Sequence, residues 1–239
     1  MNLSKLDVVI LCGGLGTRFR EVDSQIPKVM ASVIGRPFLD RVVELFLNQG
    51  CQRFIFCTGY KSEVIEEYLR SPRYGAQTEV IISKEMQVLG TAGAIKHAEP
   101  YIHSEPFLVV NGDSYCKIDL AMFVKFHTQN NAYVSIALTP ADMRKDAGGV
   151  SIDEHTSEVT TFEEKVRRKN IYNNAGIYLF SKGSILQYGS VQSLSLEYDV
   201  FPKLIRHGLY GFVVHSPVID IGTPERYYGA PTYFKTLNV

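Results

Sequence analysis

The chain has 239 residues, enough for one large domain with a substantial core. Its 25 Lys and Arg residues balance 25 Asp and Glu residues, so the formal net charge is zero. This balance excludes the basic excess that general nucleic-acid binding requires, and we expect any phosphate binding to be local.

The amino-acid sequence shows neither a secretory signal pattern nor a membrane-spanning run. The first residues do not form a signal peptide, and no apolar run approaches the roughly 18 residues that a membrane span requires. We therefore expect a cytoplasmic protein with neither nucleic acid nor membrane as a partner. The four cysteines have no paired C-x-x-C spacing and lie in or beside apolar runs, which predicts buried thiols: Cys12, Cys51, Cys57 and Cys116.

The first half of the chain alternates short apolar runs with helical patterns. The predicted strands are 7–11, 53–58, 79–82 and 107–110, and the predicted helices are 37–48, 61–69 and 91–98. Thr91 is the expected N-cap of the third helix. Such alternation predicts an α/β, Rossmann-like fold with right-handed crossovers, a mostly parallel sheet and helices on both faces.

The second half, from about residue 119, contains mostly strand patterns. After a helix at 120–129, the predicted elements are strands at 133–138, 149–152, 158–162 and 175–180, a helical stretch at 197–206, and strands at 211–215 and 218–221. Few helices separate these strands, so we expect mixed or antiparallel additions to the same sheet within one domain. Pro202 should start or kink its helix, and Thr223-Pro224 should begin the last one. Exposed aromatic residues there would permit a homodimer: Tyr227, Tyr228 and Phe234.

A glycine-rich loop follows the first strand and contains Gly13, Gly14 and Gly16. Backbone N–H groups in such a loop can cradle phosphate oxygens, and Arg18 and Lys28 would add positive charge. A Walker loop is excluded because its Gly-Lys-Ser/Thr is missing. A dinucleotide fingerprint is excluded because the third glycine and the acidic residue after the second strand are missing. A structural turn with incidental glycines remains an alternative.

Six segments, in this order, resemble the sugar-1-phosphate nucleotidyltransferases. They are 13–18 with 27–28, 89–94, 111–113, 162–165, 174–178 and 220–224. The resemblance implies the nucleotide-diphospho-sugar transferase fold, with a nucleotide-binding half at about 1–118 and a sugar-binding half at about 119–239. It also implies a Mg²⁺-dependent reaction that joins a sugar 1-phosphate to a nucleoside triphosphate and releases pyrophosphate.

The resemblance also implies roles for individual residues. Asp113 follows a buried strand, where a carboxylate is tolerated only if water or a cation serves it, and Asp220 resembles the second metal-binding aspartate. Arg18 and Lys28 would contact phosphates. The implied nucleotide-binding residues are Leu11, Gly13, Gly14, Gly16, Thr17, Glu85, Gly90, Thr91 and Asn111. The implied sugar-phosphate-binding residues are Gly149, Glu163, Lys165 and Asn174, the last expected to open a strand at a sheet edge.

Glu85 bears on the choice of base. Relatives that use thymidine or uridine nucleotides carry a glutamine here, whereas a carboxylate only accepts hydrogen bonds and so suits the adjacent N1–H and N2–H of guanine. This favours GTP, although Glu85 could instead face solvent. The short chain most resembles guanylyltransferases that act on heptose 1-phosphate for bacterial surface polysaccharides. A mannose-1-phosphate guanylyltransferase, a uridylyl-, thymidylyl- or cytidylyltransferase, and a non-catalytic NDP-sugar sensor remain alternatives.

Overall fold

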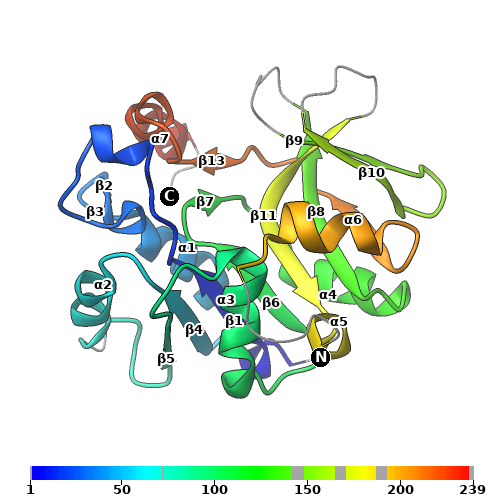
Figure 1. Ribbon diagram of the computed structural model, residues 1–239, viewed down its shortest axis with the longest axis horizontal. Coiled ribbons are helices and arrows are strands. Elements are labelled where there is room, and N and C mark those ends of the chain that lie inside the picture. Colours follow the sequence, from blue (N-terminus) through cyan, green and yellow to red (C-terminus); the bar gives the residue numbers. More distant parts are fainter. Residues whose placement is uncertain (1, 72, 142–147, 165–170, 187–192, 237–239) are drawn as a thin grey trace.

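Four parallel strands form the centre of the molecule. The computed structural model describes residues 2–71, 73–141, 148–164, 171–186 and 193–236 (Figure 1). The four strands stand in the order β6, β1, β4, β5, and all their pairings are parallel. Their bounds are Asp7–Leu11 (β1), Arg53–Thr58 (β4), Glu79–Lys84 (β5) and Phe107–Asn111 (β6). The predicted parallel sheet is confirmed.

The second half of the chain continues this sheet with mixed pairing, as predicted. Strand β11 pairs antiparallel with β6, and it also pairs antiparallel with β8 and β9; β10 adds to β9 and β12 runs parallel to β8. The described part of the chain thus forms one nine-stranded sheet. The added strands are Val134–Pro140 (β8), Gly148–Ile152 (β9), Val159–Glu164 (β10), Tyr172–Phe180 (β11) and Leu209–Val213 (β12).

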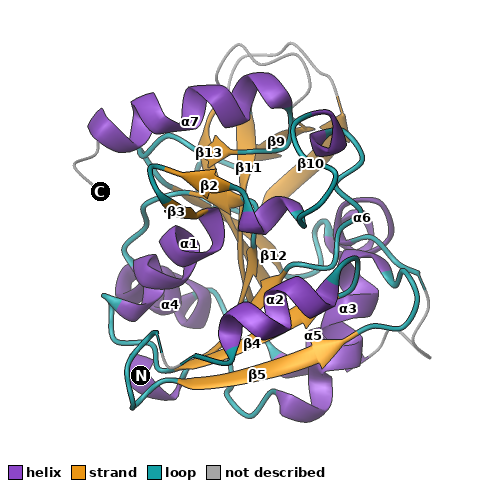
Figure 2. Cartoon of the chain, turned by 90° about the vertical axis from the view of Figure 1, so that its left-hand side faces the viewer, coloured by secondary structure: helices purple, strands orange, loops and turns teal. Residues whose placement is uncertain are grey.

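Helices cover both faces of the sheet, because the central strands are apolar on both sides. Val8 and Ile10 belong to the core under α1, α2, α4 and α7, whereas Val9 belongs to the core under α3 and α6 (Figure 2). The helices are Phe38–Leu47 (α1), Ser62–Leu69 (α2), Gly90–Ala98 (α3), Leu120–Gln129 (α4), Lys182–Leu186 (α5), Phe201–Leu204 (α6) and Pro224–Thr236 (α7). Within the described ranges, no helix combines the length and apolar character needed to cross a bilayer.

Helix ends confirm two of the three sequence expectations. Pro202 lies at the start of α6, after a π-helical turn at Leu196–Val200, and the Arg226 backbone N–H donates to the Thr223 hydroxyl at the start of α7. The expected Thr91 N-cap is wrong, because α3 begins at Gly90 and the residue before it is Leu89. The Thr91 hydroxyl accepts instead from the Leu196 backbone N–H at 2.7 Å, a partner distant in sequence.

Two small two-stranded sheets lie beside the carboxyl ends of the central strands. Strand β7, Ser114–Tyr115, pairs antiparallel with β13, Ile219–Asp220, and the hairpin of β2 (Ser32–Val33) and β3 (Arg36–Pro37) packs near α7.

The expected exposure of Phe234 is wrong: its ring is fully buried against Phe38 and Tyr115. Tyr228 is exposed, so the homodimer stays a prediction. The four cysteines are buried and free, as predicted.

His127 should make the fold sensitive to acid. Its ring in α4 is buried between the Ser135 and Ser181 hydroxyls, at 2.9 and 3.2 Å, and burial lowers the pKa of His127 to about 4. The unfolded chain, with a histidine pKa near 6.5, binds the proton first, so stability is lost as pH falls from about 6.5 toward 4. We expect this residue to account for a loss of about 3 kcal/mol across that window.

Urea unfolding of the wild type and of His127→Gln, measured between pH 7.5 and pH 4.5, isolates this contribution. The variant should be less stable than the wild type at pH 7.5, and the difference should shrink as the pH falls, because only the wild type carries the titrating ring. A difference that stays constant over this range would show that folding does not change the pKa of His127.

Candidate active site

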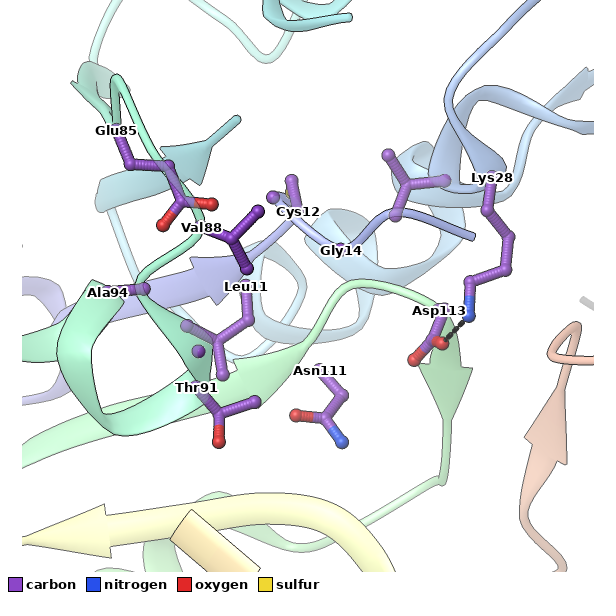
Figure 3. A pocket seen from close by; sticks show the side chains of 13 residues that line it. Leu11, Cys12, Gly14, Lys28, Glu85, Val88, Thr91, Ala94, Asn111 and Asp113 are labelled. Atoms are coloured by element: carbon purple, nitrogen blue, oxygen red, sulfur yellow. Dashed lines mark hydrogen bonds and ion pairs between the residues drawn. The ribbon is translucent and has the colours of Figure 1, made fainter. Parts of the chain in front are cut away.

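A pocket of about 210 Å³ opens at the carboxyl ends of β1 and β6, beside the segment that follows β5 (Figure 3). Ligands of open α/β sheets bind at this edge. The lining residues come from separate parts of the chain: Leu11, Cys12, Gly13, Gly14, Lys28, Val29, Glu85, Val88, Gly90, Thr91, Ala94, Asn111 and Asp113. The fold therefore brings together most of the residues expected at the nucleotide.

The glycine loop needs its glycines for two different reasons. A Cβ on Gly13 would lie 2.7 Å from the Glu85 Oε1 atom, so a side chain there would displace that carboxylate. A Cβ on Gly14 would meet nothing within 4 Å, so the loop backbone there is open to a ligand. The half-buried Glu85 carboxylate therefore packs against the loop on one side, and the backbone at Gly14 is open on the other.

Lys28 and Asp113 form an ion pair at one end of the pocket (Figure 3). Lys28 begins the short 3₁₀ turn Lys28–Met30, directly after Pro27, and Asp113 follows β6. Burial opposes ionisation of Asp113, but the Lys28 ammonium and a hydrogen bond from Ser114 outweigh it, so the pKa of Asp113 lies below its usual range. Asp113 is therefore a carboxylate at neutral pH.

Asp220 does not line this pocket, but the pairing of β7 with β13 brings its strand beside the segment that follows Asp113. In that pairing Asp220 stands opposite Ser114, and the Ile221 N–H donates to the Asp113 carbonyl at 3.2 Å. The Asp220 Oδ1 atom accepts from the Gly222 N–H and from the Arg226 guanidinium, each at 3.0 Å. Among the described residues, no group of three or more His, Cys, Asp and Glu side chains is placed to hold a metal ion. The metal site expected at Asp113 and Asp220 stays a prediction.

Glu85 lies at the other end of the pocket (Figure 3). It directly follows β5, is half-buried, and its Oε2 atom accepts from the Leu89 N–H at 3.4 Å. Burial raises the pKa of Glu85. The side chain lines the pocket, so the alternative that it merely faces bulk solvent is wrong.

Gly90 is required where α3 meets the segment 194–197. Its φ is +70°, and a Cβ there would lie 2.5 Å from the Leu194 carbonyl oxygen, which also accepts from the Ala92 N–H at 2.9 Å. Both the left-handed backbone and this close approach to backbone atoms exclude a side chain. Gly90 therefore fixes how the second half of the chain docks on the pocket.

Replacing Gly90 with alanine should lower the free energy of unfolding by about 2 kcal/mol, because the new Cβ strains the backbone and separates it from Leu194. Denaturant unfolding measures the loss. Gly183→Ala is the matched control, since Gly183 lies in α5, has no positive φ, and a Cβ there would meet nothing within 4 Å. Equal stability of Gly90→Ala and the wild type would contradict the steric argument.

Glu197 is a site residue that the sequence did not reveal. Its Oε2 atom accepts from the Ser195 hydroxyl at 2.9 Å and from the Thr91 hydroxyl at 3.3 Å, and its Oε1 atom lies 3.5 Å from the Tyr178 hydroxyl. Thr91 lines the pocket, so this carboxylate connects the pocket wall to β11. In sequence, Ser195 and Glu197 show only the pattern of a helix cap, and the partners come from distant segments.

The residues expected at the sugar lie on neighbouring strands. Gly149 of β9 stands opposite Glu163 of β10 on one side and Asn173 of β11 on the other. The expected edge position of Asn174 is wrong, because β11 lies inside the sheet between β6 and the added strands. The Asn174 amide donates to the Tyr178 hydroxyl at 2.8 Å and accepts from the Gly176 N–H at 2.9 Å. Lys165 lies outside the described residues.

Three expected nucleotide contacts lie outside the pocket lining: Gly16, Thr17 and Arg18. They form the turn that leads into the polar spacer 19–26, and the Arg18 and Thr17 side chains are exposed. Phe19, the first residue of that spacer, is buried with an edge-on contact to Tyr227 of α7, the ring centroids being 5.5 Å apart. Through this contact, the spacer packs the segment after the glycine loop against α7.

Comparisons with known proteins agree with this arrangement. The nucleotidyl transferase family model matches residues 7–235. The D-glycero-alpha-D-manno-heptose 1-phosphate guanylyltransferase of Campylobacter jejuni is 34% identical over 223 residues, covering 93% of this chain and 97% of that protein. The protein of the same name from Aneurinibacillus thermoaerophilus is 33% identical over 223 residues, covering 93% of this chain and 95% of that protein.

The fold agrees as well. The crystal structure of HddC from Yersinia pseudotuberculosis superimposes with a TM-score of 0.85 at 37% identity, covering 96% of this chain and 99% of that one. A structure of the same protein complexed with GMP-PN gives a TM-score of 0.81 with the same coverage. Because the family model and these relatives span nearly the whole chain, the protein belongs to the nucleotidyl transferase family, as the six ordered segments predicted.

Proposed function

We propose that the protein is a Mg²⁺-dependent guanylyltransferase that joins GTP to D-glycero-alpha-D-manno-heptose 1-phosphate, giving GDP-heptose and pyrophosphate. The observation that carries the proposal is the layout of the pocket, with the Glu85 carboxylate at one end and the Lys28–Asp113 pair at the other (Figure 3). The names of the relatives from Campylobacter jejuni and Aneurinibacillus thermoaerophilus, and the GMP-PN complex of HddC, support the choice of base and sugar.

In the proposed reaction, a phosphate oxygen of the sugar 1-phosphate bonds to the α-phosphorus of GTP. The bond from that phosphorus to the bridging oxygen of the β-phosphate breaks, and pyrophosphate leaves with the electron pair. A phosphate monoester is largely dianionic at neutral pH, so the nucleophile needs no general base. Catalysis then consists of aligning two anions and stabilising the charge that develops between them.

The carboxylates of Asp113 and Asp220 fit a Mg²⁺ site. They are hard oxygen donors, Asp220 in β13 and Asp113 directly before its partner strand β7, and Mg²⁺ in phosphoryl-transfer sites takes one or two protein carboxylates together with substrate phosphates and water. When bound, the ion would draw phosphate oxygens together and neutralise their charge. Lys28 would turn from Asp113 to a phosphate near the reacting centre, and Arg18, exposed at the loop, would cover the leaving pyrophosphate.

Recognition of the base would take place at Glu85. Its carboxylate accepts hydrogen bonds only, and guanine offers N1–H and N2–H side by side. The N–H groups of Gly13 and Gly14 would then face the triphosphate, with Leu11, Thr91 and Asn111 along the pocket wall. The aligned strand positions of Gly149 and Glu163, with Asn174 on the next strand, would hold the sugar. Lys165 would contact its phosphate.

A matrix of nucleoside triphosphates against hexose and heptose 1-phosphates, with Mg²⁺ and detection of pyrophosphate, tests the proposal. We expect the highest kcat/KM with GTP and the heptose 1-phosphate. Higher activity with mannose 1-phosphate would support the guanylyltransferase activity but identify mannose 1-phosphate as the sugar substrate. Activity with UTP and none with GTP would contradict the assignment of Glu85. Binding of GDP-sugars without turnover for any pair would identify the non-catalytic sensor instead.

A further inference from the structure

The Glu197 carboxylate fixes the direction of the hydrogen bonds behind the pocket wall. An ionised carboxylate accepts hydrogen bonds and donates none. The Oε2 atom of Glu197 accepts from the Thr91 hydroxyl at 3.3 Å, and its Oε1 atom accepts from the Tyr178 hydroxyl at 3.5 Å. Burial and the charge of Glu197 raise the pKa of Tyr178 well above its usual range, so this hydroxyl keeps its proton. Both hydroxyl protons are therefore turned toward Glu197.

At Thr91 this direction leaves only an acceptor for a ligand. A hydroxyl group has one proton and two acceptor positions. The proton of Thr91 is directed to Glu197, and one acceptor position takes the Leu196 N–H at 2.7 Å. Thr91 lines the pocket, so the remaining lone pair of its oxygen is what this side chain can offer a nucleotide.

Asn111 offers a second acceptor for the same reason. Because the Tyr178 proton is directed to Glu197, the Tyr178 oxygen accepts, and the Asn111 side chain is one of its donors. The Asn111 Nδ2 atom lies against β11, where a Cβ on Gly176 would be 3.0 Å from it. The Asn111 Oδ1 atom is buried without a hydrogen-bond partner among the described residues, and Figure 3 shows it turned toward Thr91. An unpaired buried acceptor is costly, which favours a bound donor at this point.

We propose that Glu197 is a positioning residue that presents Thr91 and Asn111 to the nucleotide as hydrogen-bond acceptors, and that a ribose hydroxyl of GTP donates to this pair. Figure 3 shows the two side chains along the wall between Glu85 and Asp113. The ribose joins the base to the phosphates, and the proposed function, on which this inference rests, places those groups at these two ends. Two acceptors repel phosphate oxygens but suit a hydroxyl, which can donate.

Calorimetric binding of nucleotides to the full chain, with Mg²⁺ and without sugar phosphate, tests this inference. The ligands are GTP, its 2′-deoxy and 3′-deoxy analogues, and the analogues with fluorine in place of either hydroxyl. Removing the hydroxyl that donates to Thr91 and Asn111 should weaken binding about tenfold, because a buried acceptor is left unpaired. Fluorine at that position should not restore the affinity, since fluorine cannot donate. Equal binding of GTP and all the analogues would overturn the inference, and so would a fluoro analogue that binds as tightly as GTP.

Glu197→Gln tests the positioning role. The glutamine amide can donate to Thr91 and free the Thr91 proton to turn into the pocket, so the preference for GTP over the fluoro analogue should largely disappear. A purely structural role would weaken the binding of every ligand equally and leave the preference unchanged, which would contradict the inference. Asp199→Asn is the matched control and should keep the wild-type preference. Asp199 belongs to the same helical turn and accepts from the Ser195 N–H, which an asparagine oxygen can also do.

Failure of this inference can be told apart from failure of the proposed function. Turnover of GTP with the heptose 1-phosphate, together with equal binding of all the analogues, would overturn only the role of Glu197. Binding of UTP in place of GTP would refute the choice of base, and the corresponding uridine analogues would then test the ribose contact. If Glu197→Gln does not fold, Tyr178→Phe breaks the link to Asn111 and should lower the same preference; an unchanged preference would contradict the inference.

Discussion

Replacing Asp113 or Asp220 with asparagine should reduce kcat/KM for guanylyl transfer by about 10³-fold, the order of loss seen when one group that stabilises transition-state charge is removed. An amide has nearly the shape of a carboxylate but lacks its charge, so each variant should weaken binding of the proposed metal ion while the β7–β13 pairing remains. Pyrophosphate release under subsaturating GTP and sugar phosphate measures the effect.

Asp153→Asn is the matched control for these two variants. Asp153 is exposed in the hairpin between β9 and β10, where its Oδ1 atom accepts from the His155 and Thr156 N–H groups, a role that an asparagine oxygen can fill. This variant should keep full activity. If Asp113→Asn or Asp220→Asn folded and were as active as the wild type, the two-aspartate metal site would be wrong. The assignment of guanine recognition to Glu85 would not be affected.

Replacing Glu85 with glutamine should lower kcat/KM for GTP by about 100-fold. Glutamine offers one accepting oxygen and turns an NH₂ group toward the donors of guanine, so one charge-assisted hydrogen bond is lost and one donor is left unpaired. For the same reason we expect activity with UTP or dTTP to rise relative to GTP. Steady-state kinetics with each triphosphate at a fixed sugar phosphate concentration measure both changes.

Gln87→Ala serves as the control for Glu85, because Gln87 belongs to the same segment after β5 but is exposed and does not line the pocket. Its preference for GTP should match that of the wild type. A Glu85→Gln enzyme with wild-type preference for GTP would place guanine recognition elsewhere. If activity fell to the same degree with every triphosphate, the role of Glu85 would be structural, through its packing against Gly13 of the glycine loop.

Errors in the interpretation of single side chains have a common physical origin. Thr91 and Asn174 have the residue types of a helix cap and a strand start, yet their polar groups bond to Leu196 and to Tyr178. Phe234 is expected to be exposed in the last helix, but α7 packs its ring against Phe38 and Tyr115. For Thr91 and Phe234 the partner comes from a distant segment, and for Asn174 the order of the strands makes its position internal; local sequence preference encodes neither.

The sequence by itself determined the elements and their class. Apolar runs such as 7–11 and 107–110, separated by helical periodicity, predict strands buried on both faces, and this signal is local. Residue type and position at strand ends also nominated the glycine loop and Asp113 as candidates, whereas the family resemblance nominated Asp220 and Glu85. The tertiary structure confirmed that Glu85, Lys28 and Asp113 line one pocket.

Only the tertiary structure decided which charges meet. The β7–β13 pairing places Asp220 beside Asp113, α7 places Arg226 on Asp220, and the docking of 194–197 places Glu197 on Thr91. These contacts join segments far apart in the chain, and their geometry depends on strand register and helix packing rather than on any local pattern. For that reason the chain's sequence nominates a nucleotidyl-transfer site, whereas the ion pairs of Asp113 and Asp220 could be recognised only in the folded protein.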